Sequence, residues 1–519
     1  MFKITAHLDY IWIPDNFIDI VQFVKMLPFK TLILIEKDSP VAIYRQIATQ
    51  LTGLIRQGMI QSGVFLPSTR ELAGLLGVHR KTIIAAYDEL VTQNWIEALP
   101  RKGIRVAIDL PVIKPRSFKL AGQNQPYQAP AKFAFAAGIT GMDANPEITR
   151  STIIVNDGFP DADLAPFDLI MREYRKQMQG VHLKRLMAMR DFGGTPNLKA
   201  ATSTFLNDSR GLNISPDHIL ITRGGQMAIY IAASLILKPG DKVLVSDPSY
   251  FIADAVFTQM GAKLIRTPVD AEGMDIDAIE RVLSKTKIKL LYIIPHHHHP
   301  TTVTMSSARR VRLLQLIKQY QLPVIEDDYD YDFHYRNSPV LPLASADHGG
   351  NVIYIGSFTK LLAPSFRVGY MIGPANFIAQ AINLKRLIDL RGDTLMEEAL
   401  AILINNGDLS RHIKRSNKSY SQRCDLICDL LSGQLSHAVT FSKPQGGMAV
   451  WLKFKEQYPL ATIIQKAASA GLMLLGAAYH SSENEKHNGI RFGFASLKEK
   501  ELQQAVDILS QITASIHTT

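Results

Sequence analysis

The sequence is poor in cysteine and has no long apolar run, and each absence excludes a class of protein. Cys424 and Cys428 are its two cysteines, so a disulfide framework is excluded and no second pair completes a zinc site. No uninterrupted apolar run reaches the roughly 18–20 residues that a membrane span needs. The first residues also lack a charged lead, a clean apolar stretch and a small-residue cleavage site. We therefore expect a cytoplasmic protein whose cysteines are small buried residues.

Positive charge, by contrast, is in excess, because the 519 residues include 57 lysines and arginines against 47 aspartates and glutamates. Such an excess favours contact with phosphate or acidic lipid, although it does not identify a fold. The length predicts two or three domains. A hydrophobic share of 46% and a charged share of 20% are typical of globular chains. The placement of the charge is therefore more informative than its sum.

Residues 38–108 have the pattern of three short helices followed by a β-hairpin. A one-sided apolar stripe predicts the first helix. Ser68, followed three residues later by Glu71, forms a capping box that opens the second helix, and Gly77 closes it. After the third helix, residues 95–108 predict two strands joined by a turn that contains proline and glycine.

The third helix of this segment opens with basic residues, as expected of a helix that enters the major groove of DNA. A plain three-helix domain with a solvated basic face is the alternative, since the segment holds eight lysines and arginines against five carboxylates. Residues 66–82, however, resemble the signature of the GntR-type winged helix-turn-helix, with a histidine where a serine is usual. The resemblance implies double-stranded operator DNA as a partner. The expected DNA contacts are Arg70, His79, Arg80, Lys81, Thr82, Arg101 and Lys102.

The segments on either side of this module carry no motif. Residues 1–37 form an N-terminal extension that is apolar enough near its end to hold a strand. Residues 109–150 contain five prolines, which break long helices or strands, with glycine, glutamine and serine between them. We therefore predict a semi-extended linker there.

From residue 151 to residue 519, strand-like runs alternate with helical stretches. Runs such as HILITRG, KVLVSDP and LPVIEDD are short and apolar and end in polar residues. Alternation of this kind predicts an α/β fold with a mostly parallel sheet covered by helices on both faces. Ligands of such sheets bind at the carboxyl ends of the strands. The polar residues that follow the strands are therefore candidate binding residues.

Lysine, hydroxyl and arginine side chains follow the predicted strand NVIYIGS. Lys360 stands at its end, Ser357 and Thr359 are hydroxyl donors beside it, and Arg367 could bind an oxyanion with two hydrogen bonds. A surface lysine among hydroxyls is the alternative. Asp327 lies in an acidic run, where grouped carboxylates are costly without a cation or a cofactor. A metal site and a solvated acidic turn are the alternatives there.

Two further strand ends carry candidate residues. Paired glycines before Gln226 would leave N–H groups for a phosphate at a helix N-terminus, unless they form only a tight turn. Tyr250 could stack on a flat ring, unless it is a core tyrosine. Pyridoxal phosphate requires this set of groups: an amine, a carboxylate, an anion cradle and a stacking surface.

The order of these motifs resembles the fold-type-I aminotransferase family over roughly residues 151–515. With the N-terminal module, the chain resembles the MocR/GabR-type transcription regulators. The resemblance implies a smaller C-terminal α+β part, a homodimer and pyridoxal 5'-phosphate, held by Lys360 as a Schiff base. Asp327 would pair with the pyridine nitrogen, Tyr329 with the phenolic oxygen, and Arg491 with a ligand carboxylate. The expected cofactor-binding residues are Gly225, Gln226, Tyr250, His297, Asp327, Tyr329, Ser357, Thr359, Lys360 and Arg367.

The loop at residues 295–302 departs from the family pattern. His297 matches, but His298 replaces a glutamine and Thr302 a glycine. The four consecutive histidines also suggest a metal, yet neighbours on an extended chain point to alternate sides, so one ion cannot take all four. We expect no metal. No arginine follows Tyr250, so a γ-amino acid effector is not supported.

Three functions fit these motifs. The first is a regulator that senses a vitamin B6 vitamer or an amino compound, whose binding shifts the geometry of two DNA-reading modules. The second is an active class I/II aminotransferase with an accessory DNA-binding domain, because Lys360 could move a proton on the substrate. The third is a DNA-binding scaffold without cofactor, against which the presence of both Lys360 and Asp327 argues. We favour the regulator.

Overall fold

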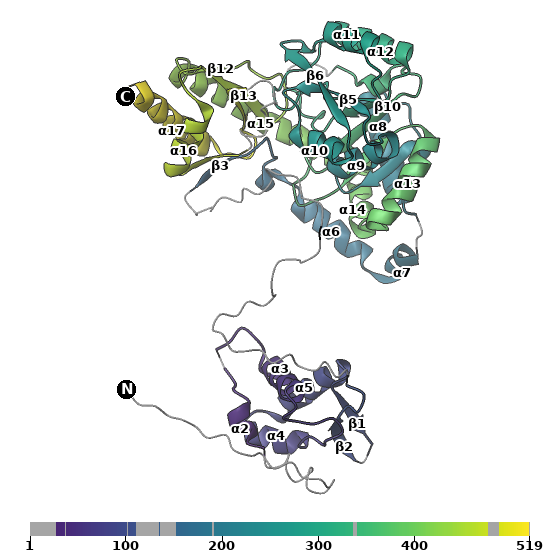
Figure 1. Cartoon of the computed structure of the whole chain (residues 1–519), viewed down its shortest axis with the longest axis vertical. Coiled ribbons are helices and arrows are strands. Elements are labelled where there is room, and N and C mark those ends of the chain that lie inside the picture. The colour runs from purple at the N-terminus through teal and green to yellow at the C-terminus, as the bar shows by residue number, and fades with distance from the viewer. Residues whose placement is uncertain are drawn as a thin grey trace. The chain divides into compact units, whose positions relative to one another are not determined.

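The computed structural model describes residues 27–36, 38–100, 102–110, 134, 152–188, 191–335, 340–475 and 487–517. The chain divides into two compact units, Met1–Phe135 and Ala136–Thr519 (Figure 1). Arg101 and nearly all of the predicted linker lie outside the described residues. Within the described part of the chain, no helix combines the length and apolar character needed to cross a membrane.

The N-terminal unit has the three helices and the two-stranded wing that the sequence predicts. Helix α5 packs against α3 and α4, and the wing strands pair antiparallel, with Ile96 opposite Val106. Apolar side chains from all three helices, among them Leu51, Leu72 and Ile83, are fully buried in one core. The elements are α2 (Phe29–Leu32), α3 (Ile43–Arg56), α4 (Thr69–Leu76), α5 (Arg80–Thr92), β1 (Ile96–Leu99) and β2 (Gly103–Val106).

Local hydrogen bonds fix the start of α4 and the turn from α4 to α5. Ser68 Oγ accepts from the Glu71 backbone N–H at 3.2 Å, and the Glu71 carboxylate accepts from the Ser68 N–H at 2.8 Å, which confirms the capping box. Gly77 ends α4 with φ 64°, a left-handed conformation that suits glycine. His79 then caps α5, because its Nδ1 accepts from the Lys81 N–H at 3.2 Å. The histidine therefore performs the capping task of the usual serine.

The apolar stretch before residue 38, which the sequence showed only to be apolar enough for a strand, contains the short helix α2. Phe29 and Ile33 are only 1% and 3% exposed and pack into the core of the N-terminal unit. The helix is held by local backbone hydrogen bonds, such as that from the Ile33 N–H to the Phe29 carbonyl oxygen at 2.9 Å, and the residues after it are held by side chains of α3. Gln50 both accepts from the Leu34 N–H and donates to the Leu34 carbonyl oxygen, at 2.8 and 2.7 Å.

A single eight-stranded sheet forms the centre of the second unit. The five strands from β10 to β6 run parallel, whereas β11 is antiparallel to both of its neighbours and β7 is antiparallel to β6. This confirms the mostly parallel sheet. In spatial order the strands are β4 (Ile219–Thr222), β11 (Gly369–Ile372), β10 (Val352–Ser357), β9 (Val324–Asp327), β8 (Leu290–Ile293), β5 (Lys242–Asp247), β6 (Lys263–Asp270) and β7 (Gly273–Met274).

Helices cover both faces of this sheet (Figure 1). Along β5, Val243 and Val245 belong to one apolar cluster and Leu244 to another, as alternation of side chains across a covered strand requires. The helices of this larger part of the unit, not all of which lie against the sheet, are α6 (Phe167–Gln177), α7 (Gly180–Ala188), α8 (Pro196–Arg210), α9 (Gly225–Ile236), α10 (Phe251–Gln259), α11 (Ile276–Lys285), α12 (Ser307–Tyr320), α13 (Ala375–Asp389) and α14 (Thr394–Asn405).

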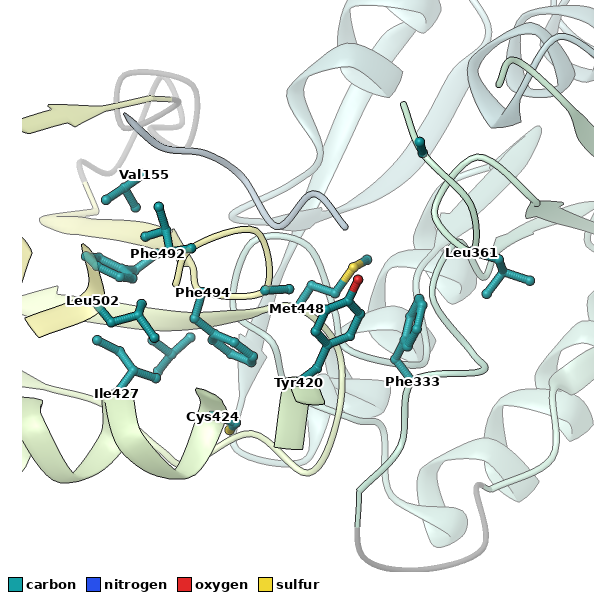
Figure 2. Packing of buried hydrophobic residues seen from close by; sticks show 14 of the residues in the cluster. Val155, Phe333, Leu361, Tyr420, Cys424, Ile427, Met448, Phe492, Phe494 and Leu502 are labelled. Atoms are coloured by element: carbon teal, nitrogen blue, oxygen red, sulfur yellow. The ribbon is translucent and has the colours of Figure 1, made fainter. Parts of the chain in front are cut away.

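A smaller α+β part follows, as expected. Its antiparallel sheet packs with three helices, and β3 pairs in parallel with β14, which ties the start of the unit to its end. Figure 2 shows its core continuing through Met448 and Tyr420 to Phe333 of the larger part, and the two cysteines are buried on α15. The elements are β3 (Ile153–Val155), α15 (Asp408–Gln434), β12 (Val439–Thr440), β13 (Ala449–Phe454), α16 (Leu460–Ser469), β14 (Leu472–Leu474), β15 (Gly489–Gly493) and α17 (Glu499–His517).

Candidate functional site

A cavity of about 340 Å³ lies at the carboxyl ends of the central strands. Strands β4, β5, β9 and β10 each end at or just before a residue that lines it. The fold thus brings together side chains that lie far apart in the sequence. Nine of the ten expected cofactor-binding residues line the cavity: Gly225, Gln226, Tyr250, Asp327, Tyr329, Ser357, Thr359, Lys360 and Arg367.

Lys360 is the amine of the cavity. Its Nζ donates to the Gly158 carbonyl oxygen at 2.9 Å and lies 4.4 Å from the centre of the Phe159 ring. Burial lowers the pKa of Lys360 to about 8, against the opposing effect of nearby carboxylates such as Asp157. A lysine with this pKa is partly neutral near pH 7.5, so it can act as a nucleophile toward an aldehyde.

Asp327 lies at the end of β9 with its carboxylate buried. Its Oδ2 accepts a hydrogen bond from the Tyr292 hydroxyl at 2.7 Å, and burial raises the pKa of Asp327 to about 7. A cationic ring nitrogen placed beside it would restore the charged form. Tyr292 was missed by the sequence analysis, because a buried strand tyrosine on β8 has no sequence signal that separates it from core.

A candidate anion cradle lies at the N-terminus of α9. Gly224 precedes the helix with φ 85°, and a Cβ on it would meet the Arg367 guanidinium at 2.8 Å, so glycine lets the arginine reach the backbone. Arg367 donates to the Arg223 carbonyl oxygen at 3.2 Å. Free N–H groups at a helix start, with an arginine beside them, are suited to a phosphate. Ser357 lines the same cavity.

Thr359 and the pair formed by Tyr250 and Gln226 are also held by hydrogen bonds within the protein. Thr359 Oγ1 donates to the Phe366 carbonyl oxygen at 2.8 Å, which ties down the loop after β10. The Tyr250 hydroxyl accepts from Gln226 Nε2 at 3.2 Å. This hydrogen bond holds the Tyr250 ring at the cavity wall, where it can stack on a planar ligand.

The loop of four histidines differs from expectation, because His299 and not His297 lines the cavity. His297 adopts a positive φ of 43°, which turns its ring to Asp330, with Nδ1 2.9 Å from Oδ1. The His299 ring packs edge-on against Tyr250, with 4.8 Å between ring centres. Thr302, at the family's glycine position, has φ 62°, a conformation that costs a β-branched residue about 1–2 kcal/mol.

The side chains of the four histidines contact different polar partners. His296 is 3.2 Å from Asp328, and His298 contacts Ser246 at 2.9 Å. His299 Nε2 lies 2.6 Å from an oxygen of Asp157. Across the described residues, no group of three or more histidine, cysteine, aspartate or glutamate side chains is arranged to hold a metal ion.

Arg491, expected to bind a ligand carboxylate, is 1% exposed on β15 and donates to protein oxygens. Its acceptors include the Asp157 carbonyl, the Pro300 carbonyl and the Tyr329 hydroxyl, at 3.2, 3.3 and 2.9 Å. Tyr329 in turn donates to the His297 carbonyl oxygen at 2.9 Å. The residues after β3 that line the cavity, Asn156, Asp157 and Phe159, were also missed, although they follow a strand as the other site residues do.

The candidate DNA contacts lie at the start of α5 and beside it. Arg70, His79, Arg80 and Lys81 are exposed, and Thr82 is half-buried. Arg80 Nε donates to Thr69 Oγ1 at 3.3 Å, which holds its guanidinium beside the start of α4. Lys102 is exposed at the tip of the wing.

Comparison with known families follows this division into two units. A model of the class I and II aminotransferases matches residues 170–509, and a model of the bacterial regulatory proteins of the gntR family matches residues 43–106. The chain belongs to the class I and II aminotransferase family. Because a GntR module precedes the family domain, the chain has the architecture of the MocR-type regulators.

Similar proteins of known sequence include both regulators and enzymes. The probable rhizopine catabolism regulatory protein MocR of Rhizobium meliloti is 26% identical over 92% of this chain and 95% of its own length. The HTH-type transcriptional regulator YdfD of Bacillus subtilis is 28% identical over 89% of this chain and 94% of its own length. Aromatic-amino-acid aminotransferase 1 of Thermococcus litoralis is 28% identical but spans only 70% of this chain and 88% of its own.

Solved aminotransferase structures match the second unit. The kynurenine aminotransferase of Pyrococcus horikoshii, in complex with PMP, has a TM-score of 0.66 and 27% identity over 71% of this chain and 92% of its own. LysN, the α-aminoadipate aminotransferase of Thermus thermophilus, also has a TM-score of 0.66. It is 23% identical over 71% of this chain and 94% of its own. The fold-type-I architecture expected from the sequence is therefore confirmed.

Proposed function

We propose that this family member is a DNA-binding transcription regulator that holds pyridoxal 5'-phosphate and responds to a small amino compound or a B6 vitamer. The observation that carries the proposal is the joint presence of an amine, a carboxylate and an anion cradle in one cavity, on a chain that also carries a GntR-type module. A protein with this role would act in the cytoplasm, where its operator lies.

Each demand of the cofactor has a residue in the cavity. Lys360 would bind the aldehyde carbon, Asp327 would keep the ring nitrogen protonated, and Arg367 with the start of α9 would hold the phosphate. Tyr250 would lie against the ring. When bound, the cofactor supplies an aldehyde that reacts with primary amines and a ring that withdraws electrons from the attached carbon.

DNA recognition would use the exposed start of α5 in the major groove and the wing on the adjacent backbone. Two such modules in a homodimer would bind paired half-sites. A ligand can change this binding only if it has different affinity for two arrangements of the modules. Regulators with the same two parts, aligned over nearly their whole length, support this role.

An active aminotransferase is the second candidate, supported by the similarity to an aromatic amino acid aminotransferase. Turnover separates the two functions. As a regulator, the protein loaded with pyridoxal phosphate should bind DNA from upstream of its own gene and show no fast steady-state transfer between amino acids and 2-oxo acids. Fast transfer without DNA binding would favour the enzyme.

Cofactor capture is tested with the Lys360→Ala variant. Wild-type protein mixed with pyridoxal phosphate should develop the visible absorbance of a lysine-bound cofactor, and Lys360→Ala should not. Lys453→Ala, which removes an exposed lysine on β13, is the control and should behave as wild type. A colourless wild type would exclude both the regulator and the enzyme.

A further inference from the structure

Asp157 provides a carboxylate inside the ligand site. It follows β3 and lines the cavity, with its side chain 26% exposed. One oxygen lies 2.6 Å from His299 Nε2, and the other lies 3.6 Å from Arg491 Nε. Burial lowers the pKa of His299, so the ring is neutral near pH 7 and donates an N–H to the carboxylate. The negative charge of Asp157 therefore acts on two cations, the guanidinium of Arg491 and the amine of Lys360.

The protein itself already supplies acceptors for the guanidinium of Arg491. The guanidinium is 1% exposed and is held by the Asp157 carbonyl, the Pro300 carbonyl and the Tyr329 hydroxyl. A ligand carboxylate would have to break these contacts and lie beside the charge of Asp157. Like charges at such short range in a partly buried site are unfavourable.

The rest of the described cavity wall offers no other cation to a ligand carboxylate. Arg367 lies at the anion cradle, where the cofactor phosphate needs it, and Lys360 is the group that reacts. The remaining wall is largely apolar. It includes Phe159, Phe251, Ile252, Pro364 and Leu475.

We propose that Asp157 takes the place of a ligand carboxylate, so that the site selects primary amines with an apolar body over the corresponding α-amino acids. The inference rests on the proposed function, because it concerns the ligand of the cofactor-loaded site. The ammonium group of an amine is attracted to Asp157, whereas the additional carboxylate of an amino acid is repelled. The effector class is thus set by a residue of the chain itself.

The test uses two pairs of ligands that differ only in the carboxylate: phenethylamine with phenylalanine, and 3-methylbutylamine with leucine. Calorimetric titration of the full-length, cofactor-loaded protein, without any 2-oxo acid, should give Kd values at least about tenfold lower for each amine, equivalent to about 1.4 kcal/mol. Equal or tighter binding of the amino acids would overturn the inference, as would binding of neither class.

Asp157→Asn separates charge from structure, because the amide can still accept the His299 hydrogen bond. We expect the preference for the amine to fall by about tenfold or more, mainly through tighter binding of the amino acids. Asp217→Asn, at an exposed aspartate beside β4, is the matched control and should keep the wild-type preference. An unchanged preference in Asp157→Asn would overturn the assignment. Failure of the wild type to take up pyridoxal phosphate would instead refute the proposed function.

Discussion

The two units of this protein use their functional residues in opposite ways. In the N-terminal module the candidate DNA contacts, such as Arg80 and Lys81, are exposed and stand on a small helical core. In the aminotransferase unit, Asp327 and Arg491 are buried, and burial shifts the pKa of Lys360 and of Asp327. Long-range attraction to DNA needs exposed charge, whereas covalent capture of a cofactor needs an amine that burial has made reactive.

The largest change in binding affinity is expected for a substitution in the buried site of the aminotransferase unit. Asp327→Asn removes the charge expected to pair with the ring nitrogen while it keeps the shape of the side chain. Loss of one partner of a buried charge pair costs about 2–5 kcal/mol, so the Kd for pyridoxal phosphate should rise roughly 30-fold or more. Absorbance titration measures it. Tyr292→Phe, which removes only the hydroxyl that donates to Asp327, should have a smaller effect, and a larger one would contradict the role given to the charge.

Substitution of an exposed residue of the N-terminal module should have a smaller effect on affinity and should not affect cofactor binding. Arg80→Ala should raise the Kd for operator DNA by roughly 5- to 150-fold, as expected for loss of one base or backbone contact of about 1–3 kcal/mol. Cofactor absorbance should stay unchanged. Lys30→Ala, at an exposed lysine on α2, serves as the control in the same gel-shift titration. Equal effects of the two variants would show that only diffuse positive charge is used.

The rate of cofactor capture should depend on pH according to the Lys360 pKa of about 8. Burial lowers this pKa from its ordinary value, so the neutral, reactive amine increases about tenfold per pH unit below 8 and levels off above it. Stopped-flow absorbance between pH 6.5 and 9.5 would measure this. A rate that continues to rise tenfold per unit beyond pH 9 would indicate a lysine with an ordinary pKa.

The smallest effect concerns the stability of the DNA-reading module. Ser68→Ala removes the side-chain acceptor of the Glu71 N–H at the start of α4. Loss of such a cap costs about 1 kcal/mol of the free energy of unfolding. Denaturant unfolding of the full chain, followed by a signal from Trp95 in this unit, should show it. Ser68→Asp, which can still cap, should retain most of the stability, and a loss equal to that of alanine would argue against the capping box.

Features that depend on neighbours in the sequence could be predicted, and those that depend on folding could not. The capping box at Ser68, the strand ends and the lysine after β10 follow from local patterns. The side chains of Gln46 and Gln50 that bind the chain after α2 come from another helix, so the local pattern could not reveal these contacts. Likewise, the positive φ of His297 decides which histidine faces the cavity.

Reciprocal coupling between the two units is the most direct test of the account. DNA from upstream of the protein's gene would be footprinted with cofactor-loaded wild type and with Lys360→Ala, with and without phenethylamine. A ligand that favours one arrangement must change DNA affinity and, by the same factor, have its own affinity changed by DNA. The account predicts a changed footprint or affinity in the wild type and none in Lys360→Ala. An identical footprint under all four conditions would contradict it.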